Sequence, residues 1–156
     1  MSSNNVTLKT SVRTKLTGES ESHSRTLLKS RDLVDIADEP EVRGGTNEGF
    51  APTEMALASL IACSNVISHK IAKKNNIDII DMEFSLNAEF NRLGVTLVDE
   101  VDVPFPEIIL DISITTTATD TELQVLKDDL PRFCPVAKVF SMSGSNVITN
   151  WTVIRP

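Results

Sequence analysis

The sequence predicts an α+β fold in one domain spanning residues 1–156. Three observations predict it. A long apolar segment without a helix breaker lies between two groups of alternating, strand-like segments, two shorter helical segments follow, and a last strand-like segment ends the sequence. A chain of 156 residues, 40% of them hydrophobic, can build one ordinary core, so a second independent domain is not expected.

The first third of the sequence predicts short strands followed by a structured loop. Residues 6–16 alternate between apolar and polar side chains and predict a strand, whereas the polar residues 17–22 predict a turn or loop. Residues 25–30 and 32–36 predict two further short strands. Residues 38–52 are rich in Gly, Pro, Asn and Asp and lead directly into the most apolar segment, which indicates a structured loop rather than a linker.

The long apolar segment predicts a helix from Thr53 to about Lys74. Pro52 fits the first helical position, where its missing N–H costs nothing. The first three turns are apolar almost all round, from Met55 to Cys63. A helix of this kind is buried in the centre of a fold or at a subunit interface.

The second half predicts strands before and after two helices. Residues 77–91 alternate in part and residues 108–117 alternate cleanly, so each predicts a strand. Between them, residues 93–106 are mixed and are interrupted by prolines, although residues 95–97 could continue strand pairing. Residues 147–154 predict the final strand.

Two short helices are predicted between these strands. Thr119 and Glu122 form a capping box that starts the first, and Pro131 is expected to end it. Cys134 and Pro135 open the second, which we expect to reach about Met142 with its inward side chains at Val136, Val139 and Phe140.

Composition excludes several classes of function. The formal charge of −7 repels phosphate backbones, and no cluster of Lys and Arg is dense enough to reverse it, so nucleic-acid binding is not expected. The apolar run 55–63 is followed by polar residues and is too short to span a bilayer. Residues 1–11 lack the apolar core of a secretory signal, so we expect a cytoplasmic protein in a reducing compartment.

Two cysteines, Cys63 and Cys134, lie 71 residues apart along the chain and carry the candidate chemistry. His23 and His69 are too few and too distant to complete a zinc site, so no metal is expected. A cysteine in an apolar helix, such as Cys63, more often packs as a core residue. Cys134 lies at a predicted helix N-terminus, where N–H groups and the helix dipole stabilise a thiolate.

Two separated motifs resemble those of the OsmC/Ohr superfamily. The first runs from Asp38 to Cys63 and joins a Gly-rich loop, a Pro that enters a helix, a carboxylate just inside that helix, and a Cys eleven residues after the Pro. The second, residues 134–140, resembles the second-cysteine motif of the same family. The resemblance implies a mostly antiparallel sheet around a long buried central helix, in an intertwined homodimer.

The resemblance also implies cysteine-based reduction of organic or other hydroperoxides, in defence against oxidative stress. Cys63 would be the peroxidatic thiolate and Cys134 the resolving thiol, with an external dithiol as reductant and with no cofactor or metal. Two alternatives from other classes stay open: a non-catalytic protein that binds a small apolar ligand in the same pocket, and a thiol redox sensor that uses the same cysteine pair.

The supporting residues depart from the family's pattern. Hydroperoxide-reducing members place a Glu directly after the Pro, whereas this sequence has Thr53 there and Glu54 one place later. On an ideal helix Glu54 lies about 180° from Cys63, so compensation of the helix dipole is its favoured role. The best candidate for the Arg that holds the thiolate is Arg25, ahead of Arg13 and Arg31, and His23 could line the same pocket.

Overall fold

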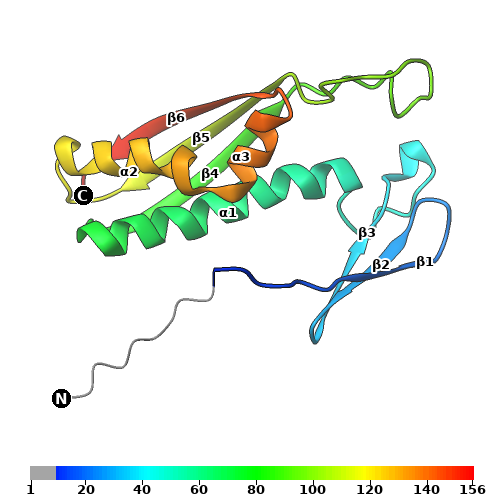
Figure 1. The fold of residues 1–156 in the computed structure, drawn as a ribbon, viewed down its shortest axis with the longest axis horizontal. Helices are drawn as coiled ribbons and strands as arrows, with labels where there is room; N and C mark the ends of the chain where they lie inside the picture. Colours follow the sequence, from blue (N-terminus) through cyan, green and yellow to red (C-terminus); the bar gives the residue numbers. More distant parts are fainter. Residues whose placement is uncertain (1–9) are drawn as a thin grey trace. The chain divides into compact units, whose positions relative to one another are not determined.

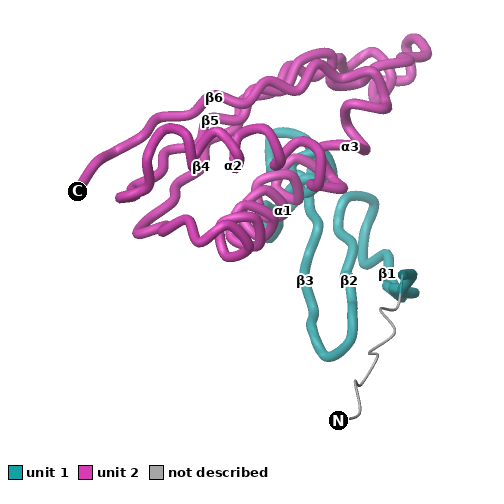
Figure 2. Tube along the Cα trace, turned by 60° about the vertical axis from the view of Figure 1, so that its left-hand side comes forward, with its two compact units in different colours: residues 1–55 teal, residues 56–156 magenta. Residues whose placement is uncertain are grey.

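A computed structural model describes residues 10–156 and divides the chain into two compact units. Unit 1 ends at Met55 and unit 2 runs from Ala56 to Pro156 (Figure 2). The described residues form two three-stranded sheets, three α-helices and one short 3-10 helix. The order of strands, long helix, strands, two helices and final strand confirms the predicted α+β class (Figure 1). The prediction of a single domain over 1–156 stays a prediction.

Unit 1 contains an antiparallel sheet of three short strands. These strands are β1 (Thr17–Ser20), β2 (Thr26–Ser30) and β3 (Leu33–Ala37), and β2 lies in the middle. The predicted second and third strands are confirmed to within one residue. The prediction for the preceding segment is wrong: residues 10–16 form no strand, and residues 17–20, predicted as a loop, form β1. Residues 6–9 of that predicted strand lie outside the described part.

The reason for this error is that β1 is an edge strand held by pairing rather than by its own composition. The ladder with β2 joins Thr17 to Lys29 and Ser20 to Thr26, and all four residues of β1 are exposed. Backbone pairing to a neighbouring strand therefore outweighs the weak strand propensity of Gly, Glu and Ser.

Helix α1 (Pro52–Asn75) begins at the predicted proline and belongs to unit 1 up to Met55 and to unit 2 from Ala56. Its buried side chains are Leu60, Ser64, Ser68, Ile71 and Ala72. Part of the apolar surface of this helix is exposed, since Ala62 is exposed and Val66 is 49% exposed. Burial of this face at a subunit interface stays a prediction.

Unit 2 is a sheet covered by helices on one face. Strands β4 (Asp81–Ala88), β5 (Glu107–Thr115) and β6 (Asn146–Ile154) are ordered β4-β5-β6, with an antiparallel pair followed by a parallel one. Alternate residues of β5 point into the core and are fully buried or nearly so: Ile108, Leu110, Ile112 and Ile114. Helices α1, α2 and α3 lie against this apolar face (Figure 1). Residues 95–97, which could have continued the pairing, lie in a turn instead.

Helix α2 (Asp120–Phe133) confirms the predicted capping box, with Thr119 as its N-cap and Glu122 completing it. It does not end at Pro131 as predicted. Proline removes one helical N–H, but the Cys134 N–H donates to the Leu130 carbonyl at 2.9 Å, and this bond closes the last turn. Leu130 is buried in the core and anchors that turn.

Helix α3 (Pro135–Met142) starts and ends where the sequence predicts. Phe140 faces inward as predicted, with Ala137 beside it, but Val139 is 66% exposed. Val136 is partly buried and packs against the core, as predicted. The inward positions are therefore 136, 137 and 140, and the prediction is wrong only for Val139.

Helix α1 is long and apolar enough, by length and composition alone, to cross a membrane. One such helix is weak evidence, because the core helix of a soluble protein meets the same criterion. Here Leu60, Ile71 and Ala72 of this helix belong to the hydrophobic core of unit 2.

Candidate active site

The candidate site of unit 2 is a pair of cysteine thiols that the fold brings into contact. Cys63 comes from the middle of α1, is half-buried and packs against the core cluster to which Cys134 belongs. The two thiols lie close enough for Cys134 to raise the pKa of Cys63, and both cysteines are free thiols. The folded chain therefore brings together two sulfurs that are far apart in the sequence.

Cys134 is the N-cap of α3, as its position before Pro135 predicts. Its side chain is fully buried, and its sulfur accepts a hydrogen bond from the Ala137 N–H at 3.5 Å. Pro135 occupies the first position of the helix, where a missing N–H does no harm. The backbone N–H of Val136 acts to lower the pKa of Cys63. The first turn of α3 thus influences both thiols.

The ionisation of Cys63 is controlled by opposing groups. Burial raises the pKa of the Cys63 thiol, and the neighbouring Cys134 thiol raises it further. The Val136 N–H and the Lys70 ammonium act to lower the pKa, but they do not compensate. The net effect is a thiol with a raised pKa, protonated at neutral pH.

We expect the reactivity of Cys63 to increase with pH, because the thiolate is the nucleophile. With its pKa above the ordinary value, alkylation of Cys63 by iodoacetamide should accelerate about tenfold per pH unit between pH 6 and pH 8. Peptide mapping by mass spectrometry after timed quenching measures the rate at Cys63 alone. A rate that stays level across this range would mean that the thiolate is already formed, contrary to the raised pKa.

Arg25 in unit 1 is held by two carboxylates. Its Nε donates to Glu21 Oε2 at 2.7 Å, and its terminal nitrogen pairs with Glu48. Glu48 was not among the residues predicted for the site. It lies in the Gly-rich loop that the family resemblance includes, and that loop is the signal from which it could have been found.

Glu54 has a local role at the start of α1. Its Oε2 accepts a hydrogen bond from the Ala51 N–H at 2.9 Å, just ahead of Pro52. This contact agrees with the expected role of an acidic residue at a helix N-terminus. The carboxylates that pair with Arg25 are those of Glu21 and Glu48, and Glu54 is not one of them.

The Gly-rich loop before α1 is organised by one buried carboxylate, Asp38. Its Oδ2 accepts hydrogen bonds from Thr46 Oγ1 at 2.6 Å, from the Thr46 N–H at 3.0 Å and from the Glu48 N–H at 3.2 Å. The Thr46 hydroxyl in particular lowers the pKa of Asp38 to about 2. Gly49 is required nearby because a Cβ there would overlap the Ile36 carbonyl. Asp38 thereby fixes the backbone of Glu48, the residue that pairs with Arg25.

We predict that Asp38→Asn lowers the melting temperature of the protein by roughly 4 °C, because an amide replaces an ionised acceptor of three hydrogen bonds. Since the pKa of Asp38 is depressed from 3.8 to about 2, its stabilising effect is present above pH 4 and is lost as the pH falls toward 2. Thermal unfolding followed by circular dichroism measures the effect. Asp32→Asn, at an exposed position, is the matched control. Equal melting temperatures for both variants would contradict this role.

The two histidines show no part in the cysteine site. His23 is exposed, and His69 Nδ1 lies 2.9 Å from the Asn65 carbonyl oxygen. Within residues 10–156 no group of three or more His, Cys, Asp or Glu side chains is placed to hold a metal ion. The expectation that no metal takes part stays an expectation.

A long helix against a covered sheet, with two neighbouring thiols on α1 and at the start of α3, makes this an α+β protein with a candidate two-cysteine site. The chain belongs to the OsmC-like protein family, whose model matches residues 45–150. No curated protein matches the chain by sequence.

Solved structures with this fold come from several bacteria. The OsmC-like protein from Mycoplasma pneumoniae is 20% identical with a TM-score of 0.77, over 92% of this chain and 98% of that one. An organic hydroperoxide resistance protein from Elizabethkingia anophelis, crystallised with thiocyanate bound, is 20% identical with a TM-score of 0.64, over 96% and 100%. The organic hydroperoxide resistance protein OhrB of Bacillus subtilis is 22% identical with a TM-score of 0.55, over 92% and 98%. At these identities the likeness shows a shared fold.

Proposed function

We propose that this protein is a thiol-dependent peroxidase that reduces organic or other hydroperoxides through Cys63 and Cys134. The observation that carries the proposal is the proximity of the two free thiols, which pack in one core cluster and interact in their ionisation. Neighbouring thiols need only a small movement to form a disulfide, which is the product of the second step. The organic hydroperoxide resistance proteins that share the fold support the choice of substrate.

The difference in exposure between the two cysteines supports their roles. Cys63 is half-buried, so a hydroperoxide can reach its sulfur, whereas Cys134 is fully buried. A peroxidatic thiol must meet the substrate, while a resolving thiol needs only to meet the first sulfur. We therefore assign the peroxidatic role to Cys63 and the resolving role to Cys134.

The proposed reaction has three steps. The Cys63 thiolate attacks the terminal oxygen of the hydroperoxide, the O–O bond breaks, and the alkoxide leaves and takes a proton to give the alcohol. Cys63 is then a sulfenic acid, and the Cys134 thiol attacks its sulfur to form a disulfide while water leaves. An external dithiol reduces the disulfide by thiol exchange and becomes a disulfide itself. No cofactor enters these steps.

The raised pKa of Cys63 favours a second candidate function, a thiol redox sensor. A protonated thiol reacts slowly, and a sensor needs oxidation without rapid turnover. The third interpretation, a binding protein for a small apolar ligand, differs from both because it needs no change at the thiols.

Turnover separates these functions. The protein is mixed with cumene hydroperoxide and excess dithiothreitol, and loss of hydroperoxide is followed with time. Repeated turnover with the dithiol supports a peroxidase alone. Loss of two thiols per chain without repeated turnover supports a sensor, and no loss of hydroperoxide supports a binding protein. Absence of any thiol loss at millimolar hydroperoxide would refute both redox functions.

We further propose that the protein works as a cytoplasmic homodimer. The exposed apolar face of α1, including Ala62 and Val66, supports a second copy as the group that covers it. Light scattering coupled to gel filtration tests this with the full chain. A mass of one chain at micromolar concentration would contradict the dimer and leave the thiol chemistry to be tested by turnover.

A further inference from the structure

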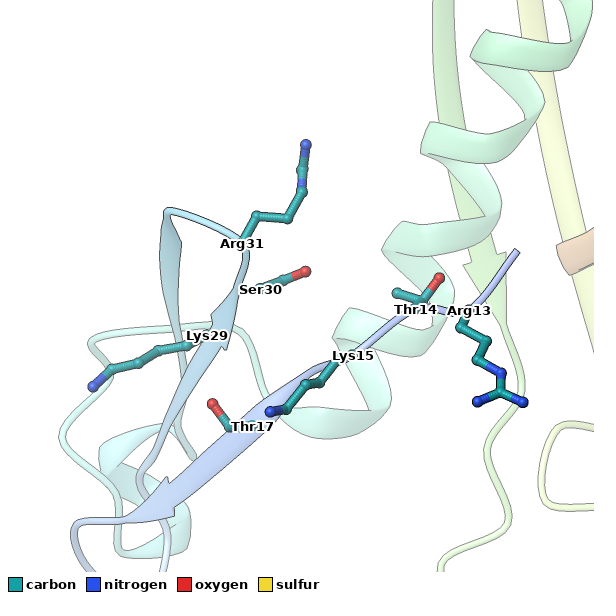
Figure 3. Close-up of a pocket in the computed structure, with 7 residues that line it drawn as sticks. All are labelled: Arg13, Thr14, Lys15, Thr17, Lys29, Ser30 and Arg31. Atoms are coloured by element: carbon teal, nitrogen blue, oxygen red, sulfur yellow. The ribbon is translucent and has the colours of Figure 1, made fainter.

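We propose that unit 1 carries a binding site for a small multivalent oxyanion of the phosphate class, separate from the cysteine pair. The site is a surface cleft of about 580 Å³ between the segment before β1 and the turn that joins β2 to β3 (Figure 3). Four cationic side chains line it, and no carboxylate does. They are Arg13, Lys15, Lys29 and Arg31.

The backbone explains why the cleft forms. The ladder between β1 and β2 ends at the pair Thr17 and Lys29, and no ladder pair precedes Thr17 in the described residues. The β2–β3 turn lies just beyond Ser30, which pairs with Leu33. Arg31 holds this two-residue turn with φ of 58°, in the left-handed region that such hairpin turns require. The segment upstream of Thr17 and this turn therefore form two separate walls.

The cationic residues of unit 1 fall into two groups, those in ion pairs and those at the cleft. Residues 10–55 contain six Lys and Arg residues. Two of them, Arg25 and Arg43, form ion pairs with carboxylates, whereas the remaining four line the cleft and form no ion pair in the described part of the chain. In a chain with a net charge of −7, four unpaired cations at one cleft make a local positive field.

The other groups of the cleft are hydroxyls. Thr14, Thr17 and Ser30 line it, and the Ser30 hydroxyl points across the gap toward the opposite wall (Figure 3). Hydroxyls donate hydrogen bonds to phosphate oxygens, and guanidinium groups bind them in a bidentate manner. Lys29 and Arg13 extend away from the gap (Figure 3), and both are exposed, so rotation of their side chains can bring the charges to an anion.

Acidic residues close to the cleft limit the length of the anion that can bind there. Asp32 lies in the turn beside Arg31 and Asp35 lies in β3, and neither lines the cleft. A short oxyanion fits among the four cations, whereas an extended nucleic acid would also lie over acidic surface and be repelled. The site is therefore expected to prefer a di- or triphosphate group over a long polyanion.

Inorganic pyrophosphate is the probe. Binding to the full chain is measured by isothermal titration calorimetry at low ionic strength, and the site is located from ¹⁵N chemical-shift changes. We expect saturable binding that weakens with added salt, with the largest shifts at residues 13–17 and 29–31. The double variant Lys15→Gln/Arg31→Gln should bind pyrophosphate at least tenfold more weakly than the parent chain. The double variant Lys15→Gln/Lys29→Gln should also bind it more weakly.

The matched control is Lys73→Gln/Lys74→Gln in α1, which removes the same two charges at exposed positions and should stay within twofold of the parent chain. Absence of binding at millimolar pyrophosphate would overturn the proposal. An equal loss of affinity in the control variant would also overturn it, because binding would then depend on the charge of the whole chain and not on the cleft. Tighter binding of single-stranded DNA than of pyrophosphate would overturn it as well.

Discussion

Replacement of Cys63 by serine is expected to abolish hydroperoxide turnover, with a loss of at least about a thousandfold in kcat/KM. A serine hydroxyl at this position has no accessible ionised form near neutral pH and cannot form a stable sulfenic acid or disulfide. The substitution changes one atom at a half-buried site, so the fold should be retained. Steady-state turnover of cumene hydroperoxide with excess dithiothreitol measures the effect, and circular dichroism checks the fold.

The control for this prediction lies one turn further along the helix. Val66→Ala trims an exposed side chain of α1 and leaves both thiols in place, so it should retain turnover. Turnover that survives Cys63→Ser would refute the assignment of the peroxidatic role. Equal losses of turnover in both variants would show that the loss comes from altered helix packing and not from the missing thiol.

Replacement of Cys134 by serine is expected to separate the first step from the second. Cys63 should still lose its thiol once per chain, but no disulfide can follow, so turnover should fall roughly tenfold or more. Serine at the N-cap of α3 keeps a side chain that accepts the Ala137 N–H, so the helix start is preserved. The neighbouring thiol that helps to raise the pKa of Cys63 is removed, and the first oxidation should not be slower than in the parent chain.

Trapping of the sulfenic acid tests this second prediction. Dimedone added with one equivalent of cumene hydroperoxide should label Cys63 in the Cys134→Ser variant and label the parent chain much less, because Cys134 intercepts the intermediate there. Full turnover in the variant would show that the external dithiol reaches Cys63 directly and that Cys134 has no resolving role.

Much of the fold could be predicted because its elements carry strong local signals. The Pro52 entry, the capping box at Thr119 and the clean alternation of β5 each act within a few residues. The failures occur where long-range contacts decide. β1 is a strand because β2 pairs with it, and α2 passes through Pro131 because Leu130 is held in the core.

Of the candidate site, the sequence could predict only the identity of the two cysteines. Each cysteine is a rare residue in a recognisable local motif, but their contact depends on how α1 and α3 meet, which no local pattern records. The role of Glu48 could not be predicted for a similar reason. It depends on Asp38, which binds the backbone of the Gly-rich loop and so sets where the Glu48 side chain emerges. The pKa of Cys63 likewise depends on burial, on the Val136 N–H and on Lys70, from different parts of unit 2.

The most direct test of the two-cysteine site is the mass of the whole chain after one equivalent of cumene hydroperoxide without reductant. The proposal predicts a chain lighter by two hydrogens, two thiols fewer, and a proteolytic peptide pair joined through Cys63 and Cys134. A chain that gains oxygen at one cysteine while the other stays a free thiol, or a disulfide formed only between two chains, would contradict the account.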